Sequence, residues 1–162
     1  LAAKMNAHSA EHLMAISDEG ITALAKSGTV AVLLPATSFF LMSPIYAPAK
    51  KMIEEGVRVA LATDYNPGSS PTENLQMAMW AACYKMKLLP AQILRGVTIN
   101  AAYAIAREKT IGSIEEGKQA DLVIFDAPNI DFLVYHFGVN SVDQVWKKGK
   151  LVAENGRLVY NN

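Results

Sequence analysis

The chain has 162 residues, about the length of one domain, and its 15 Lys and Arg balance its 15 Asp and Glu. Without a basic stripe or a charged tail, the sequence shows no sign of a nucleic-acid partner. Hydrophobic residues make up 51% of the chain, which is enough for a packed core and too many for a disordered protein.

The single cysteine, Cys83, excludes an internal disulfide and a cysteine-cluster metal site. It lies in an apolar helical run over residues 77–83, where a packed thiol is favoured over a nucleophile. The apolar runs are too short to span a bilayer and the N-terminus lacks a signal-peptide pattern, so we expect a cytoplasmic protein. The chain begins at Leu1 rather than Met, which indicates a processed or truncated piece.

Helices and strands alternate over the first hundred residues. A helix is expected to begin near Ser17, with acidic residues in its first turn, and to end at Gly28. Continuous apolar runs at 29–34 and 57–62 predict strands buried on both faces, as in a parallel sheet. Between them we expect a loop to residue 48 and a short helix that Gly56 closes.

After the second strand comes a turn-rich stretch, ATDYNPGSSP, at residues 62–71. Ser70, Pro71 and Glu73 form a capping-box pattern, which predicts a long helix from there to about Lys87. A further helix restarts at Leu89-Pro90 and runs, with one interruption, to residue 107. This alternation predicts βαβ units.

The pattern changes beyond about residue 110, where short strand candidates follow one another. They cover residues 120–125, 142–147, 150–153 and 157–160. Lys148-Gly149 and Asn155-Gly156 are typical of hairpin turns between them. This part of the chain is therefore predicted to be a small antiparallel β module.

A charged residue, Asp64, follows the second predicted strand. The C-terminal ends of barrel strands converge on an active site, and a buried carboxylate is costly unless it is paired, hydrogen-bonded or bound to a metal. Asp64 is therefore a ligand or base, or else a turn cap that accepts amides from Asn66 onward, and both interpretations stay open. Gly68 and Ser69 offer backbone amides and a hydroxyl to an anion ahead of a helix, while Ser70 is explained as the helix cap.

The three histidines are His8, His12 and His136. His12 could end an earlier strand as Asp64 ends its own. No helix is indicated around it, so His8 and His12 are not read as an i, i+4 metal pair, and neither His-Glu-x-x-His nor His-x-His occurs. From the residues alone, each histidine fits a loop or the core better than a catalyst.

Residues 63–71, Thr-Asp-Tyr-Asn-Pro-Gly-Ser-Ser-Pro, closely resemble the signature of the imidazolonepropionases, amidohydrolase-superfamily enzymes of histidine degradation. The likeness continues at residues 9–13, 34–40, 98–102, 112–122 and 135–140. The 112–122 stretch is general to amidohydrolases, whereas Asp-Tyr-Asn-Pro-Gly-Ser-Ser and Tyr-His-Phe-Gly are far more specific.

The resemblance covers essentially the whole chain but only the C-terminal part of the family's sequence. It implies an α/β fold, the C-terminal part of a metal-dependent (β/α)8 barrel followed by strands of a small β-sandwich domain. Residues 1–108 would form about three βα units with extra helices, and residues 109–162 would form part of the sandwich. His136, in the tail, is expected to be structural.

In that family a Zn or Fe ion activates water to attack the ring carbonyl of 4-imidazolone-5-propanoate, giving N-formimidoyl-L-glutamate. By resemblance, Asp64 is a metal ligand that also takes a proton from the water. His12 matches the histidine that polarises the substrate or shuttles protons. Asn66, Gly68 and Ser69 match residues that bind the substrate.

The resemblance also implies that the family's other metal ligands would precede Leu1, which leaves Asp64 alone. We therefore expect the isolated chain to be inactive and not to bind Zn or Fe stoichiometrically. Exposed barrel edges predict a homodimer or an exchange of elements between chains. Two alternatives stay open: another amidohydrolase, dihydroorotase-like or cytosine-deaminase-like, and a non-catalytic domain with a degenerate site.

Overall fold

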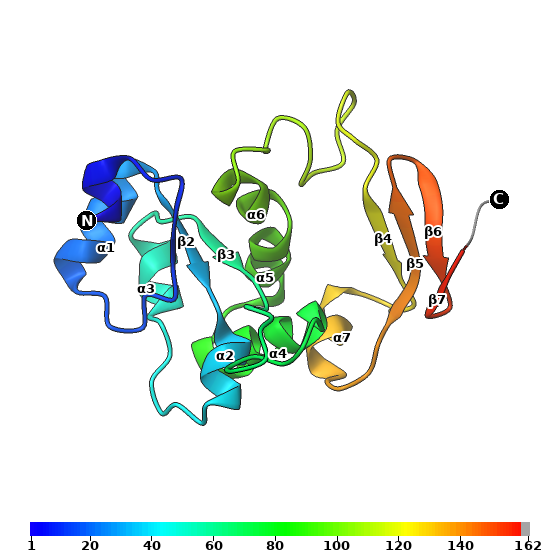
Figure 1. Ribbon diagram of the computed structural model, residues 1–162, viewed down its shortest axis with the longest axis horizontal. Helices are drawn as coiled ribbons and strands as arrows, with labels where there is room; N and C mark the ends of the chain where they lie inside the picture. The colour runs from blue at the N-terminus through cyan, green and yellow to red at the C-terminus, as the bar shows by residue number, and fades with distance from the viewer. Residues whose placement is uncertain (160–162) are drawn as a thin grey trace.

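The fold contains two sheets, one parallel and one antiparallel, joined by helices (Figure 1). The structure is a computed structural model, and it describes residues 1–159. Its elements are η1 (Ala2–Met5), β1 (Ser9–Glu11), α1 (Asp18–Ser27), β2 (Val30–Leu33), α2 (Pro35–Phe40), α3 (Ala49–Glu54), β3 (Val59–Leu61), α4 (Leu75–Met86), α5 (Pro90–Val97), α6 (Ile99–Ala104), β4 (Leu122–Phe125), α7 (Ile130–Tyr135), β5 (Val142–Lys147), β6 (Lys150–Glu154) and β7 (Arg157–Leu158). No helix among the described residues is both long and apolar enough to cross a membrane.

The parallel sheet has the order β1-β2-β3, with helices in each crossover. Ala31 of β2 pairs with Ala10 on one side and Val59 on the other, so β2 is the central strand. All three residues of β3 are buried, which agrees with the prediction of strands covered on both faces. The three strands and their crossovers confirm the βαβ interpretation of the first hundred residues.

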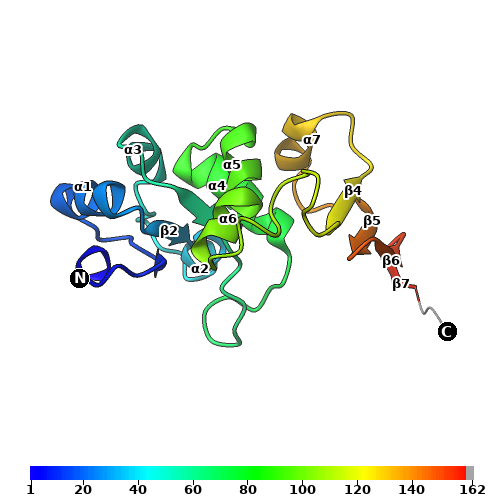
Figure 2. The same cartoon turned by 90° about the horizontal axis from the view of Figure 1, so that it is seen from above.

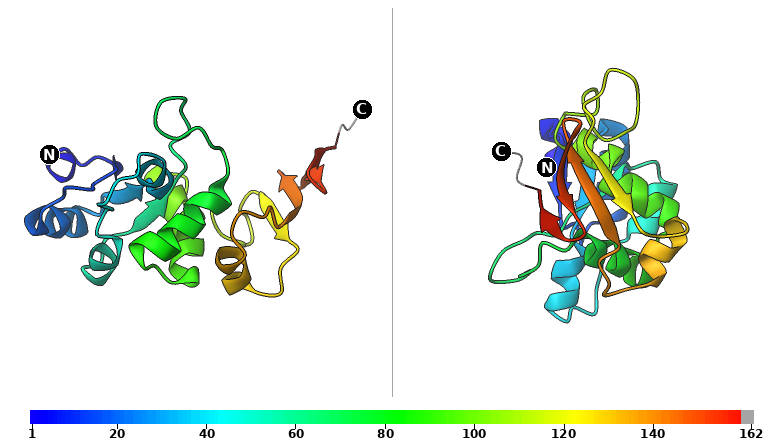
Figure 3. Two further views of the ribbon diagram at one scale, coloured as in Figure 1. Left: turned by 90° about the horizontal axis from the view of Figure 1, so that it is seen from below. Right: turned by 90° about the vertical axis from the view of Figure 1, so that its right-hand side faces the viewer.

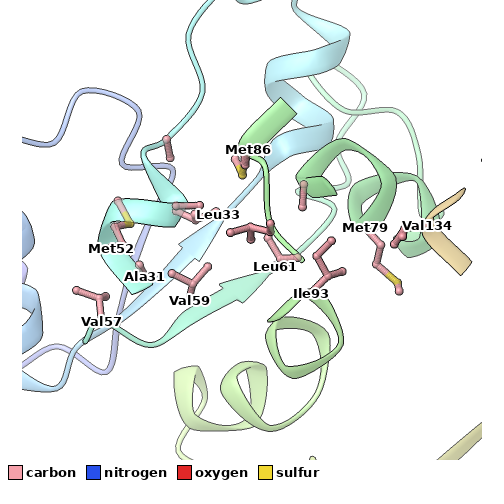
Figure 4. Close-up of a cluster of buried hydrophobic side chains, with 14 of the residues drawn as sticks. Ala31, Leu33, Met52, Val57, Val59, Leu61, Met79, Met86, Ile93 and Val134 are labelled. Carbon is pink, nitrogen blue, oxygen red and sulfur yellow. The ribbon is translucent and has the colours of Figure 1, made fainter. Parts of the chain in front are cut away.

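The main core lies between one face of this sheet and the helices that cover it (Figure 4). Leu33 and Leu61 point into it from β2 and β3, and Met52 of α3 and Ile93 of α5 are fully buried there. Gly96 lets α5 approach closely, because a Cβ at that position would lie 3.2 Å from a side-chain carbon of Leu61. The helices are therefore held against the strands by side-chain packing.

Helix α6 lies against the other face of the sheet, where Val30, Ala60 and Ala104 form a small buried cluster. The side-chain amide of Asn100 donates a 2.9 Å hydrogen bond to the carbonyl of Val59, the first residue of β3. Strand β3 runs from Val59 towards Asp64. The Asn100 contact therefore places the start of α6 near the first residue of β3, away from Asp64. Asn100 lies in the 98–102 segment of the resemblance, and this contact gives it a structural role.

The antiparallel sheet has the order β4-β5-β6-β7 and lies far from the N-terminus along the molecule (Figures 2 and 3). The four predicted strands are confirmed, with the hairpin turns at Lys148-Gly149 and Asn155-Gly156. The predicted last strand extends to Tyr160, which lies outside the described residues. Asp121 fastens the start of β4 to the β5–β6 turn, since its carboxylate accepts from the Lys147 ammonium and the Lys148 amide.

Helix α4 packs against the antiparallel part of the chain as well as against the parallel part. Gln76 of α4 donates to the side chain of Asn140 at 2.8 Å and accepts from the amide of Ser141 at 3.1 Å. One turn later the ring of Trp80 lies 5.4 Å from that of Phe137. Residues 135–140 of the specific resemblance are thus the segment that holds the antiparallel part against α4.

Two helix predictions need correction. Helix α4 begins at Leu75 with Asn74 as its cap, and the Asn74 side chain accepts from the amide of Met77, so the predicted cap at Ser70 is wrong. Ser70 is fully buried and its hydroxyl donates to the carbonyl of Thr63 instead. The predicted loop over residues 35–48 contains α2, because Pro35 begins a helix there rather than only ending a strand.

The remaining helices follow the sequence closely. Ser17 caps α1 and Gly28 ends it in a left-handed conformation, as predicted. The interrupted helix beyond residue 89 is confirmed as α5 and α6, which break at Thr98. Helix α7 was not predicted, because the hydrophobic run 130–135 is too short to show helical periodicity.

Candidate functional site

The residues that follow β1 and β3 lie at the same edge of the parallel sheet. His12 continues β1, and its amide donates a 3.0 Å hydrogen bond to the carbonyl of Val32 on the central strand. On the other side, the amide of Ala62 donates to the carbonyl of Leu33 at 3.2 Å. Parallel strands present their C-terminal ends together, so Asp64 and His12 come together although 52 residues separate them.

The side chains of these two residues face each other. Nε2 of His12 lies 4.0 Å from Oδ2 of Asp64, and the side chains are 52% and 29% exposed. That separation suits an ion pair when His12 is protonated but is too long for a direct hydrogen bond. A small shift, or one intervening water or substrate atom, would connect the two groups for proton transfer.

Both residues adopt backbone conformations that side chains disfavour. The φ angle is +65° at His12 and +54° at Asp64, in the left-handed region. Aspartate tolerates this region better than most residues, and histidine is also enriched there. Unusual backbone angles at two converging strand ends are a common property of functional sites.

The carboxylate of Asp64 is held by a residue that the sequence did not identify. The hydroxyl of Thr37, on α2, donates a 2.9 Å hydrogen bond to Oδ2 of Asp64. Within residues 1–159, Oδ1 of Asp64 accepts no hydrogen bond. The only sequence signal for Thr37 was its place in the 34–40 segment of the resemblance.

The loop after Asp64 is folded around the side chain of Asn66. Its Oδ1 accepts from the amides of Gly68 and Ser69 at 2.9 and 2.8 Å, and its Nδ2 donates to the carbonyl of Asp64 at 2.7 Å. The three predicted substrate-binding residues are therefore brought together directly beside Asp64. The expected anion cradle at a helix N-terminus is wrong, because the helix starts later and these two amides are already bonded.

The other residues singled out in the sequence lie elsewhere. His8 precedes β1 and is thus at the opposite end of that strand from His12. His136 follows α7 and its ring lies 4.8 Å from that of Phe132, in keeping with a structural role. Cys83 is partly buried beside the main core, and this burial raises the pKa of its thiol, as expected for a packed side chain rather than a nucleophile.

The chemistry of Asp64 and His12 fits a metal centre only in part. Carboxylate and imidazole are both donors that zinc and iron accept, and Oδ1 of Asp64 is available. However, no group of three or more His, Cys, Asp or Glu side chains in the described part of the chain could hold a metal ion. Among residues 1–159, Asp64 could therefore share a metal ion with at most one further side chain of these types.

Comparison with known sequences identifies the relatives of the chain. Residues 4–152 match the sequence model of the amidohydrolase family. The chain is 98% identical over 162 residues to an imidazolonepropionase of Treponema denticola, and 58% identical over 152 residues to one of Fusobacterium nucleatum. These matches cover 100% and 94% of this chain but only 39% and 37% of the relatives, so the chain spans about two fifths of their length.

Solved structures of other proteins also share the fold of this chain. An adenosine deaminase from Xanthomonas campestris with bound zinc has a TM-score of 0.87 and 27% identity, covering 98% of this chain and 40% of that one. An atrazine chlorohydrolase variant from Arthrobacter aurescens has a TM-score of 0.84 and 20% identity, covering 97% of this chain and 39% of that one. Both similarities extend across the parallel and antiparallel parts, which supports the predicted fold class.

Proposed function

The chain belongs to the amidohydrolase family, and from this we propose that it is the C-terminal part of an imidazolonepropionase. The proposed reaction is the hydrolysis of 4-imidazolone-5-propanoate to N-formimidoyl-L-glutamate. Water adds to the ring carbonyl carbon, the ring C–N bond breaks, and the released nitrogen takes a proton. The observation that carries the proposal is the pairing of His12 with Asp64 at 4.0 Å on one edge of the parallel sheet.

In the proposed mechanism Asp64 accepts a proton from the attacking water. His12, across the 4.0 Å gap, polarises the substrate or relays this proton to the leaving nitrogen. Asn66, Gly68 and Ser69 contact the substrate from the loop that follows Asp64. Since their hydrogen bonds already bind this loop to itself, they would present a rigid surface rather than close around the ligand.

The proposed cofactor is one zinc or iron ion, with Asp64 as a ligand. When bound, such an ion supplies a water molecule whose pKa is lowered towards neutrality. The adenosine deaminase that shares this fold has bound zinc, which supports a metal of this kind. We propose that the isolated chain binds neither ion stoichiometrically and is inactive, because a single carboxylate cannot hold zinc with useful affinity.

We further propose that residues 1–108 belong to the barrel and residues 109–162 to a β-sandwich. The parallel sheet supports the first assignment and the antiparallel strands support the second. Strands β1 and β3 each pair with one neighbour among the described residues, so each leaves an open edge. The isolated chain would cover these edges by dimerisation or by exchanging elements between copies.

The test uses the full-length Treponema denticola relative with this chain's sequence over the 162 matched residues. It is assayed with 4-imidazolone-5-propanoate, and with dihydroorotate and cytosine as the alternative substrates. The proposal predicts turnover of the first substrate and none of the others. The Asp64→Asn variant is expected to lose both metal and activity, since an amide oxygen is a weak zinc ligand and a weak base.

Turnover of dihydroorotate or cytosine in place of imidazolone propanoate would assign the chain to another amidohydrolase activity. A purified protein that holds metal but turns over none of the three would favour the non-catalytic alternative. Asp64→Asn with unchanged activity would remove Asp64 from the mechanism. The three outcomes are separate, because substrate choice, metal content and the effect of the substitution are measured independently.

A further inference from the structure

Thr37 makes a contact with Asp64 that the sequence did not predict. It lies on α2, which starts at Pro35 directly after β2, while Asp64 follows the neighbouring strand β3. Its hydroxyl donates a 2.9 Å hydrogen bond to Oδ2 of Asp64 across 27 residues of sequence. We propose that Thr37 is the positioning residue for Asp64, fixing one carboxylate oxygen so that the other is presented to the metal. This inference rests on the proposed function.

The hydroxyl of Thr37 lies in a buried part of the chain. The residue is 5% exposed, and the neighbouring residues of α2 from Pro35 to Ser38 are buried as well. A buried threonine has few accessible rotamers, because its branched side chain is restricted at χ1. The hydroxyl would lose a hydrogen bond without access to water if Asp64 turned away, so the orientation of the carboxylate is stabilised from the protein side.

The division of roles between the two oxygens follows from this contact. Oδ2 accepts from Thr37 and lies nearest to His12, whereas Oδ1 accepts no hydrogen bond within the part of the chain that the structure describes. A carboxylate without such a partner could rotate or present either oxygen. Residues that hydrogen-bond a metal ligand typically contribute a factor of about 10–100 to metal affinity or activity.

The experiment uses the same full-length protein with the single substitutions Thr37→Val and Thr37→Ser. Valine keeps the branched shape and removes the hydroxyl, while serine keeps the hydroxyl. Three quantities are measured: the rate of zinc loss to a chelator, and kcat and KM for 4-imidazolone-5-propanoate. We expect Thr37→Val to lose zinc about 10–100-fold faster and to lower kcat by a similar factor, with KM within about threefold. Thr37→Ser should stay within about threefold of the parent in all three.

Ser38→Ala is the matched control. Ser38 is the next residue of α2 and is 3% exposed, but its hydroxyl contacts the sulfur of Met14 at 3.5 Å rather than Asp64. Removing it tests whether any buried hydroxyl of this helix turn has the same effect, and we expect zinc loss and kcat to remain as in the parent. Should Thr37→Val fail to fold, Thr37→Ala removes the same hydroxyl in a good helix former.

Several results would overturn the positioning role. Parent-like zinc loss in Thr37→Val would do so, as would a Thr37→Ser variant as impaired as Thr37→Val, or an equal effect from Ser38→Ala. Failure of the proposed function is distinguishable: a parent protein that holds zinc without hydrolysing the substrate refutes the activity, while zinc loss still judges Thr37. A parent that holds no metal refutes both.

Discussion

Gln76 and Asn140 are 64 residues apart in the sequence, yet Nε2 of Gln76 donates a 2.8 Å hydrogen bond to Oδ1 of Asn140. The same Gln76 carboxamide accepts from the amide of Ser141, a buried residue. The nitrogen and the oxygen of the Gln76 carboxamide thus both form hydrogen bonds across the interface between α4 and the antiparallel part. With the contact between Trp80 and Phe137, they fix how that part meets the helix which follows the candidate site.

Replacing Gln76 with alanine is expected to lower the free energy of unfolding by about 1–3 kcal/mol, because the Ser141 amide loses its partner. Urea denaturation of the chain measures this. The control is Lys85→Ala on the exposed side of the same helix, which should change stability by less than about 0.5 kcal/mol. Equal effects of the two substitutions would mean that the Gln76 contacts contribute nothing specific.

The ion pair of Asp121 predicts a pH-dependent stability. The Lys147 ammonium and then the Lys148 amide lower the pKa of Asp121 from 3.8 to about 2. Since the folded pKa lies below the unfolded one, the ionised carboxylate stabilises the fold above about pH 4, and this contribution disappears as the pH falls towards about 2. Asp121→Asn should therefore be less stable than the parent at neutral pH, with the difference closing over that window.

Urea denaturation from pH 7 to pH 2 follows this difference, and Asp126→Asn serves as the control. Asp126 is exposed at the end of β4, and no ion pair of its side chain is found in residues 1–159. Its substitution removes a carboxylate without an ion pair among those residues and should change stability by less than about 0.5 kcal/mol at neutral pH. If the Asp121 difference stays constant across the whole range, these partners do not lower the pKa of Asp121.

The two histidines at opposite ends of β1 give a matched pair of substitutions. His12→Gln in the full-length protein is expected to lower kcat by about 10²–10⁴-fold, because it removes the group that polarises the substrate or relays the proton. His8→Gln, at the start of the same strand, should leave kcat unchanged. Steady-state kinetics on 4-imidazolone-5-propanoate measure both, and equal losses would contradict the assignment of His12.

The Asn66 side chain is expected to determine the shape of the loop beside Asp64. Asn66→Ala removes the acceptor for the amides of Gly68 and Ser69, so both should exchange their hydrogens with solvent faster. Amide exchange measured by NMR on the chain shows this directly. The amide of Met77, bonded to Asn74, is the internal control and should keep its rate. Unchanged exchange at Gly68 and Ser69 would show that the loop holds without Asn66.

The open edges of β1 and β3 predict self-association of the isolated chain. Sedimentation of the purified 162-residue chain should give a dimer or a concentration-dependent mixture. A monodisperse monomer at all concentrations would refute this prediction. Metal analysis of the same sample tests the proposal that the chain alone binds neither zinc nor iron stoichiometrically, which one tightly bound ion per monomer would contradict.

The sequence alone determined the two apolar strands, the antiparallel strands of the tail and the place of the candidate site after a strand, although it did not show α2 or α7. The runs at 29–34 and 57–62 are continuous and apolar because both faces of the strands are covered, and that property is written locally in the residue types. Hairpin turns at Lys148-Gly149 and Asn155-Gly156 are equally local signals. A charged residue after such a strand, Asp64, could therefore be recognised without knowledge of its neighbours.

Only the tertiary structure decided which polar groups these residues contact. The sequence pattern predicts Ser70 as a helix cap. In the structure its hydroxyl donates a hydrogen bond to the carbonyl of Thr63, and Asn74 caps the helix instead. Thr37 bonds Asp64 only because α2 and the end of β3 meet in space. A hydroxyl or carboxamide can use many partners of similar strength, so the choice depends on which partner the fold brings within about 3 Å.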